Sequence, residues 1–170
     1  MPSFSRVRVH DPLFGTVTVE LDHEAGFLSV YGERTPRVEL RRAEGTAVVP
    51  HVPIGTRDTG CLFMLLGGAP VPLRPGKGFL TRRSYKVDVG HGDAPYRYRL
   101  VPVSYDSSRF FRSGTPLGVL VSTGDGKVTA DWKDGQPDGF DASVGYALAV
   151  AFGTGAESIW QLALDAVLDW

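Results

Sequence analysis

Basic side chains gather in the middle of the sequence and share short segments with aromatic residues. Arg97 and Arg99 are two residues apart, so both lie on one face of an expected strand, opposite Tyr96 and Tyr98. Guanidinium and ammonium groups that share a surface suit phosphate or carboxylate binding. The sequence therefore predicts a ligand-binding site made of Arg82, Arg83, Lys86, Arg97 and Arg99. The alternative is that surface strands expose these side chains to water without binding anything.

Charge is distributed unevenly along the chain, whose overall net charge is −1. Residues 74–112 carry nine Arg or Lys and three Asp or Glu, a net charge of +6, whereas residues 113–170 carry −6. A basic region attracts anions over several ångströms. The expected partner of this region is therefore an anion. Arg109 and Arg112 flank two phenylalanines, a pattern that would also suit single-stranded nucleic acid, but aromatic residues in strands more often pack in a core, so nucleic acid is not the expected partner.

Motifs for catalysis are incomplete, so we expect no catalytic residues and no cofactor. The segment 153–158 begins like a dinucleotide-binding fingerprint, but Ser158 replaces the third glycine and only 12 residues follow it, too few for a return strand. No Gly-x-Ser-x-Gly nucleophile elbow occurs. An enzyme whose groups meet only in three dimensions remains the alternative, with His51, His91 or Asp88 lining a cavity. A structural protein-interaction domain is a further alternative.

Metal ligands are not arranged in a known pattern either, so we expect no metal. The four histidines are widely separated in the chain. Four aspartates in a glycine-rich segment offer oxygen ligands that calcium prefers, although their spacing fits no EF-hand. These residues are Asp131, Asp134, Asp138 and Asp141. Asp-Gly pairs are also ordinary turn residues, so the calcium site stays an open alternative.

Length and composition indicate one domain of 170 residues with a real core, since 42% of the residues are hydrophobic. No leader pattern starts the chain and no apolar run approaches the length of a membrane span. A cytoplasmic location is therefore expected, and the excess of arginine over lysine suggests a bacterium with a GC-rich genome. Cys61 has no second cysteine to pair with and begins an apolar run, so we expect it to be buried.

Alternating apolar and polar residues predict about ten or eleven short strands in the first two thirds of the chain. The alternation is clearest over residues 4–10 and 16–22. Hairpins are expected around 91–93 and 124–126, where turn residues separate two such runs. Short connections predict antiparallel neighbours. The continuous apolar run 144–152 predicts a strand buried on both faces.

A helix is predicted over residues 156–169 because this segment has no Gly or Pro inside and is rich in Ala and Leu. Its polar residues at 157, 161, 165 and 169 follow an i, i+4 spacing and form one narrow stripe. A helix that is apolar over the rest of its circumference must be surrounded by other elements. The expected fold is therefore mostly β, an antiparallel barrel of about ten to twelve strands around a hydrophobic C-terminal helix.

This combination resembles the tubby C-terminal-like superfamily, and within it the LURP-one-related and phospholipid scramblase-like domains. The matching text is the ending Gly145-Tyr146-Ala147-Leu148-Ala149-Val150 followed by residues 163–169. The resemblance implies a single tubby-like β domain over residues 1–170 that binds a phospholipid headgroup or an acidic partner rather than acting as an enzyme. The calcium-binding segment of the family does not map onto this sequence, and no phosphoinositide-binding residue can be carried over.

Overall fold

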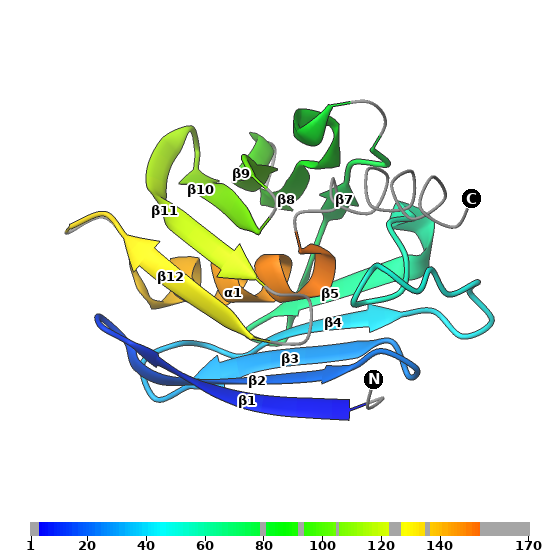
Figure 1. The fold of residues 1–170 in the computed structure, drawn as a ribbon, viewed down its shortest axis with the longest axis horizontal. Coiled ribbons are helices and arrows are strands. Elements are labelled where there is room, and N and C mark those ends of the chain that lie inside the picture. Colours follow the sequence, from blue (N-terminus) through cyan, green and yellow to red (C-terminus); the bar gives the residue numbers. More distant parts are fainter. Residues whose placement is uncertain are drawn as a thin grey trace, which may run out of the picture.

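The computed structural model describes residues 4–78, 81–91, 94–104, 106–122, 127–134 and 137–153. Twelve strands in this part of the chain form two six-stranded antiparallel sheets (Figure 1). The first sheet contains, in order, β1 (Phe4–Asp11), β2 (Gly15–Asp22), β3 (Phe27–Gly32), β4 (Val38–Arg42), β5 (Leu62–Leu66) and β6 (Ala69–Val71). The second contains β12 (Val128–Trp132), β11 (Thr115–Ser122), β10 (Ser107–Arg112), β9 (Ala94–Pro102), β8 (Val87–His91) and β7 (Leu73–Pro75).

The predicted antiparallel β architecture is confirmed, and the strands alternate as expected. Val17, Val19 and Leu21 of β2 are buried, while the residues between them are partly exposed. Both expected hairpins occur, since β8 pairs with β9 and β11 pairs with β12. Among the described residues, backbone hydrogen bonds connect the strands into two sheets, and closure of these sheets into a barrel is not shown.

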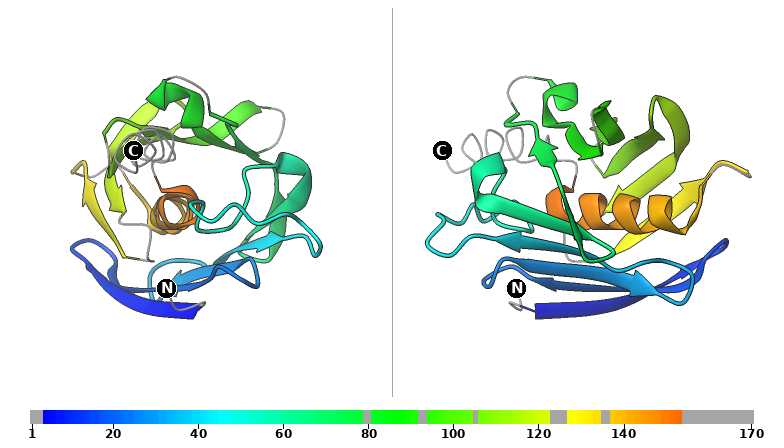
Figure 2. Two further views of the ribbon diagram at one scale, coloured as in Figure 1. Left: turned by 45° about the vertical axis from the view of Figure 1, so that its right-hand side comes forward. Right: turned by 180° about the vertical axis from the view of Figure 1, so that it is seen from behind.

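A helix, not a strand, contains the apolar run that begins at residue 144. Helix α1 (Gly139–Phe152) is buried from Asp141 to Phe152 and lies between the two sheets (Figure 2). The prediction of a buried strand over 144–152 was therefore wrong. A uniformly apolar run has no period that separates a strand from a buried helix. The predicted helix over 156–169 lies outside the described residues.

The ends of α1 explain why this segment is helical. The Asp138 carboxylate accepts a hydrogen bond from the Asp141 backbone N–H, and the Asp141 carboxylate accepts one from the Asp138 N–H, both at 2.9 Å. This reciprocal capping box satisfies backbone donors that a helix start leaves open. At the other end, Gly153 has a φ of 55°, which favours glycine and stops the helix.

The loop between β4 and β5 packs against one end of the helix and contains the 3-10 helix η1 (Thr59–Cys61). Val52 and Ile54 are buried in the core, and the Ile54 N–H donates to the Ala151 carbonyl at 3.0 Å. Cys61 is half-buried rather than fully buried, because it ends η1 before the alternation of β5 begins. In the described part of the chain, none of the helices has the length and apolar character needed to cross a membrane.

Two buried tyrosine hydroxyls bind aspartates at the core. Tyr98 donates to Asp141 at 2.8 Å, and Tyr146 donates to Asp11. Burial raises the pKa of Tyr98 to about 12 and raises that of Tyr146 further. A tyrosine in the unfolded chain has a pKa of about 10. Above that pH the unfolded state therefore loses protons that the folded state keeps.

Stability should therefore fall as the pH rises above about 10, by up to about 1.4 kcal/mol per pH unit for each such tyrosine. For Tyr98 this loss continues until its folded-state pKa of about 12 is passed. Urea unfolding at a series of pH values, from roughly two units below to one unit above the tyrosine pKa of the unfolded chain, measures how steeply the free energy of unfolding changes with pH. The Tyr98→Phe variant is expected to show a shallower slope than the native chain, and an equal slope would contradict the assignment.

Candidate functional site

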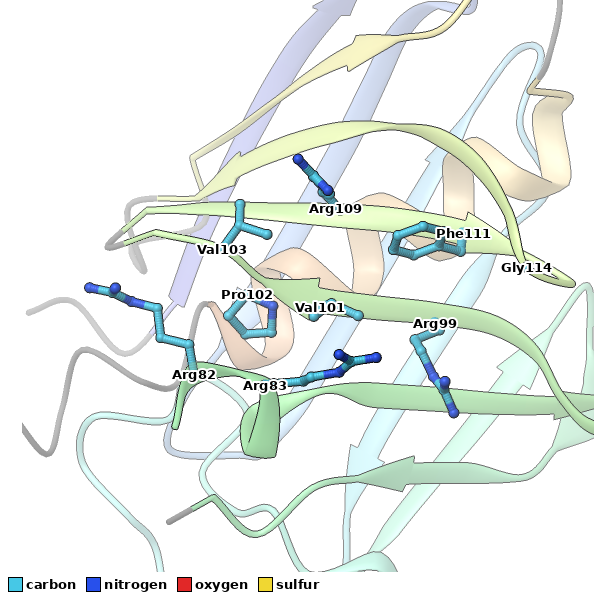
Figure 3. Close-up of a pocket in the computed structure, with 9 residues that line it drawn as sticks. All are labelled: Arg82, Arg83, Arg99, Val101, Pro102, Val103, Arg109, Phe111 and Gly114. Carbon is cyan, nitrogen blue, oxygen red and sulfur yellow. The ribbon is translucent and has the colours of Figure 1, made fainter. Parts of the chain in front are cut away.

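An open groove lies on the outer face of the second sheet, beside the 3-10 helix η2 (Arg82–Tyr85) (Figure 3). Its volume is about 680 Å³. Four arginines surround it, two from η2, one from β9 and one from β10, and apolar side chains lie between them. This basic groove is lined by Arg82, Arg83, Arg99, Val101, Pro102, Val103, Arg109, Phe111 and Gly114.

Strand register places these side chains together. Arg109 of β10 lies opposite Val101 of β9, and Phe111 lies opposite Arg99. Since residues two apart on a strand share a face, all four point away from the buried partners Leu100 and Phe110 toward the outside. A bulge between Phe110 and Phe111, where β10 pairs with β11, changes the local direction of the strand. The outer face of β9 and β10 therefore carries the apolar side chains of Val101 and Phe111 next to Arg99 and Arg109.

The arginines of the basic groove differ in their partners. Arg99 donates to both oxygens of Asp88, at 2.6 and 2.9 Å, so its charge is largely neutralised. For Arg82, Arg83 and Arg109, the described residues provide neither an ion pair nor a side-chain hydrogen bond. All three are exposed. Three arginines that line the groove therefore have guanidinium donors open to a ligand, although their side chains point in different directions (Figure 3).

The outer face of the first sheet makes a useful comparison, because three of its arginines are paired with acids. Arg6 binds Glu20 at 2.8 Å, and Glu39 lies within 3.8 Å of Arg37 and 3.4 Å of Arg41. Exposed pairs of this kind contribute little to stability, but they do neutralise charge. Arg8 of β1 and Arg74 of β7 are also exposed and have no ion pair among the described residues. The basic groove is therefore distinguished by three such arginines that line one hollow.

The predicted site residues are only partly brought together. Arg82, Arg83 and Arg99 line the basic groove, whereas Lys86 and Arg97 do not. Arg97 lies on β9 beyond the groove, with its guanidinium 5.6 Å from the centre of the Tyr98 ring. Lys86 follows η2, where its backbone N–H donates to Arg83. The sequence-based set missed Arg109, whose signal was its position two residues before Phe111 on a strand with an exposed face.

The acidic candidates serve the fold. Asp138 and Asp141 form the capping box of α1, and Asp141 also contacts Arg112. Burial, the largest effect, raises the pKa of Asp141. Asp131 lies on β12, outside that cluster. For the enzyme alternative, His51 is exposed and Asp88 binds Arg99 on the sheet surface, while the side chain of His91 lies outside the described part of the structure.

One buried arginine positions the segment that carries Arg82 and Arg83. The Arg57 guanidinium donates to the Tyr85 carbonyl at 3.2 Å and to the Gly76 carbonyl at 2.9 Å. It also reaches the Phe152 carbonyl at the C-terminal end of α1, at 3.5 Å, where a cation is favoured. Burial lowers the pKa of Arg57 to about 10. Arg57 therefore ties η2 to the central helix.

Replacing Arg57 should disturb the basic groove without removing any residue from it. Arg57→Met keeps an apolar side chain of similar length, but the carbonyls of Tyr85, Gly76 and Phe152 lose their donor. The cation over the Tyr85 and Phe152 rings is lost as well. We expect a loss of stability of about 1–3 kcal/mol and increased hydrogen exchange at residues 81–86. Hydrogen-exchange mass spectrometry measures the second effect. Unchanged exchange in this segment would show that η2 is held by other contacts.

Comparison with known proteins does not add a relative to this description. No protein-family model, curated protein or solved structure matches the chain. The function is therefore inferred from the basic groove and from the residues that position it.

Proposed function

We propose that this chain is a non-enzymatic binding module whose basic groove binds the phosphate of an anionic phospholipid headgroup. The observation that carries the proposal is that Arg82, Arg83 and Arg109 line one groove and have no partner among the described residues. Guanidinium groups bind phosphate oxygens through paired, charge-assisted hydrogen bonds. Arg99, fixed by Asp88, supplies one ordered wall of the groove.

Apolar side chains beside the arginines favour a lipid over a fully polar anion. Val103 is 43% exposed, and Val101 and Phe111 are partly exposed in the same groove. At a membrane surface such side chains reach the boundary between headgroups and acyl chains, while basic side chains contact phosphates. An acidic protein would supply carboxylates but has less need of these apolar neighbours. It is the competing outcome of the test below.

We also propose that the two sheets form a tubby-like barrel around α1, acting in the cytoplasm. Two features support closure of such a barrel. Only Pro72 separates β6 of the first sheet from β7 of the second. On the other side, Trp132 of β12 donates from its indole nitrogen to Asp11 of β1 at 2.7 Å. The resemblance to the tubby-like domains was first based on a central helix at residues 156–169. It now rests on α1, which lies between the two sheets.

Vesicle flotation tests the lipid proposal. The native chain should float with phosphatidylcholine vesicles that contain phosphatidylglycerol and stay unbound with phosphatidylcholine alone. Salt screens exposed charges, and the Debye length shortens roughly twofold between 50 and 300 mM NaCl. Binding should therefore weaken steeply over this range. Equal failure with both vesicle types would overturn the proposal. Binding to a polyglutamate column with no vesicle binding would instead favour an acidic protein partner.

A further inference from the structure

A second hollow adjoins the basic groove on the side of β12. Its volume is about 420 Å³, and it shares Arg109 and Phe111 with the basic groove. Beyond these two residues, its lining includes Pro116, Val119, Asp131 and Lys133. The two hollows therefore meet at Arg109 and Phe111, and Asp131 is the one carboxylate among the described residues that line them.

Strand register places that carboxylate in line with Arg109. Arg109 of β10 lies opposite Val119 of β11, which lies opposite Asp131 of β12. Neighbouring strands are about 4.8 Å apart, so the backbones of Arg109 and Asp131 are about 10 Å apart on one outer face. Val119, between them, is apolar and partly exposed. A short ligand lying across β11 would thus meet a cation at one end and an anion at the other.

Asp131 is available for such a ligand. It is exposed, and it pairs with neither Arg109 nor Lys133 within the described residues. Lys133, directly after β12, also lines the hollow and forms no ion pair with Asp131 within the described residues. The Phe111 ring at the junction is shared by both hollows, and an aromatic face also attracts a cation.

We propose, resting on the proposed phosphate site, that the joined hollows select a phosphate ester that carries a primary ammonium group a few bonds away. The quaternary ammonium of phosphatidylcholine has no N–H to donate to Asp131. The phosphate contacts Arg82, Arg83 and Arg109, and the ammonium contacts Asp131. Phosphoethanolamine has this chemistry. It occurs both as a soluble ester and as the headgroup of an aminophospholipid, and the experiments below distinguish these two sources.

Isothermal titration calorimetry with two soluble esters tests the selection. Ethyl phosphate has the phosphate without the ammonium, and O-phosphoethanolamine has both. We expect the native chain to prefer O-phosphoethanolamine by about fivefold. This preference corresponds to the contribution of one exposed ion pair, about 1 kcal/mol. Asp131→Asn should abolish the preference and leave the affinity for ethyl phosphate within about twofold. The matched control Asp134→Asn removes an exposed carboxylate that lines neither hollow and should keep the preference.

The outcomes separate this inference from the phosphate site on which it rests. Equal affinities for the two esters, unchanged in Asp131→Asn, would overturn the ammonium contact and leave the phosphate site standing. Failure of both esters and of anionic vesicles would overturn both proposals. Flotation with vesicles containing phosphatidylethanolamine identifies the source: binding supports the aminophospholipid, whereas binding of the soluble ester alone supports a soluble ligand.

Discussion

The Leu148→Asp variant is expected to lose its cooperative fold. Leu148 is fully buried on α1, the helix between the two sheets. The substitution removes an apolar side chain, which costs about 2–5 kcal/mol, and adds a carboxylate to an apolar environment, which costs several kcal/mol more (about 2–7). This sum is comparable to the net stability of a whole domain, about 5–15 kcal/mol. Circular dichroism during thermal unfolding should show no cooperative transition.

A matched control lies on the same helix. Phe140, in the first turn of α1, is 51% exposed, so Phe140→Asp should change the free energy of unfolding by no more than about 1 kcal/mol. The milder Leu148→Ala variant should remain folded and lose about 2–5 kcal/mol. If Leu148→Asp melts like the native chain, α1 is not the core of the domain and the central packing described above is wrong.

The second large effect is expected on binding. Replacing Arg82, Arg83 and Arg109 together by glutamine should weaken binding to anionic vesicles by about 100-fold, since each basic residue near such a surface contributes about 1 kcal/mol. All three side chains are exposed, so unfolding by heat should change little. Quantitative flotation over a range of lipid concentrations measures the affinity.

The control variant removes the same net charge from the opposite sheet. Arg6, Arg8 and Arg41 are exposed on the outer faces of β1 and β4. Their replacement by glutamine should reduce the affinity by less than about fivefold, through the overall charge alone. A comparable loss in both triple variants would mean that binding follows net charge and not the basic groove.

The strands were predictable because half-buried strands leave a period of two in the sequence, as β2 does with Val17, Val19 and Leu21. Helix α1 was not, because residues 144–152 are apolar on every side and leave no period. A signal did exist upstream: Asp138 and Asp141 have the spacing of a capping box. These two residues were interpreted as turn residues or calcium ligands instead.

The candidate site was predictable in composition but not in arrangement. Arg82 and Arg83 were recognised because they are adjacent in the sequence, and Arg99 because it lies in a basic strand. Its pairing with Asp88 depends on the register of β8 against β9, which places these two residues opposite each other. Arg109 joins the groove only through the register of β10 against β9. Register is set by the turns and by the buried face, so local charge patterns do not reveal it.

The central claim is that Arg82, Arg83 and Arg109 bind phosphate, and NMR of arginine side chains tests it most directly. Titration with sn-glycerol 3-phosphate, the ester common to glycerophospholipids, should shift the Nε–Hε signals of these three residues in a saturable manner. The signals of Arg6 and Arg41, paired with acids on the first sheet, should stay in place. Equal shifts across both sheets, or no shifts at the basic groove, would contradict the claim.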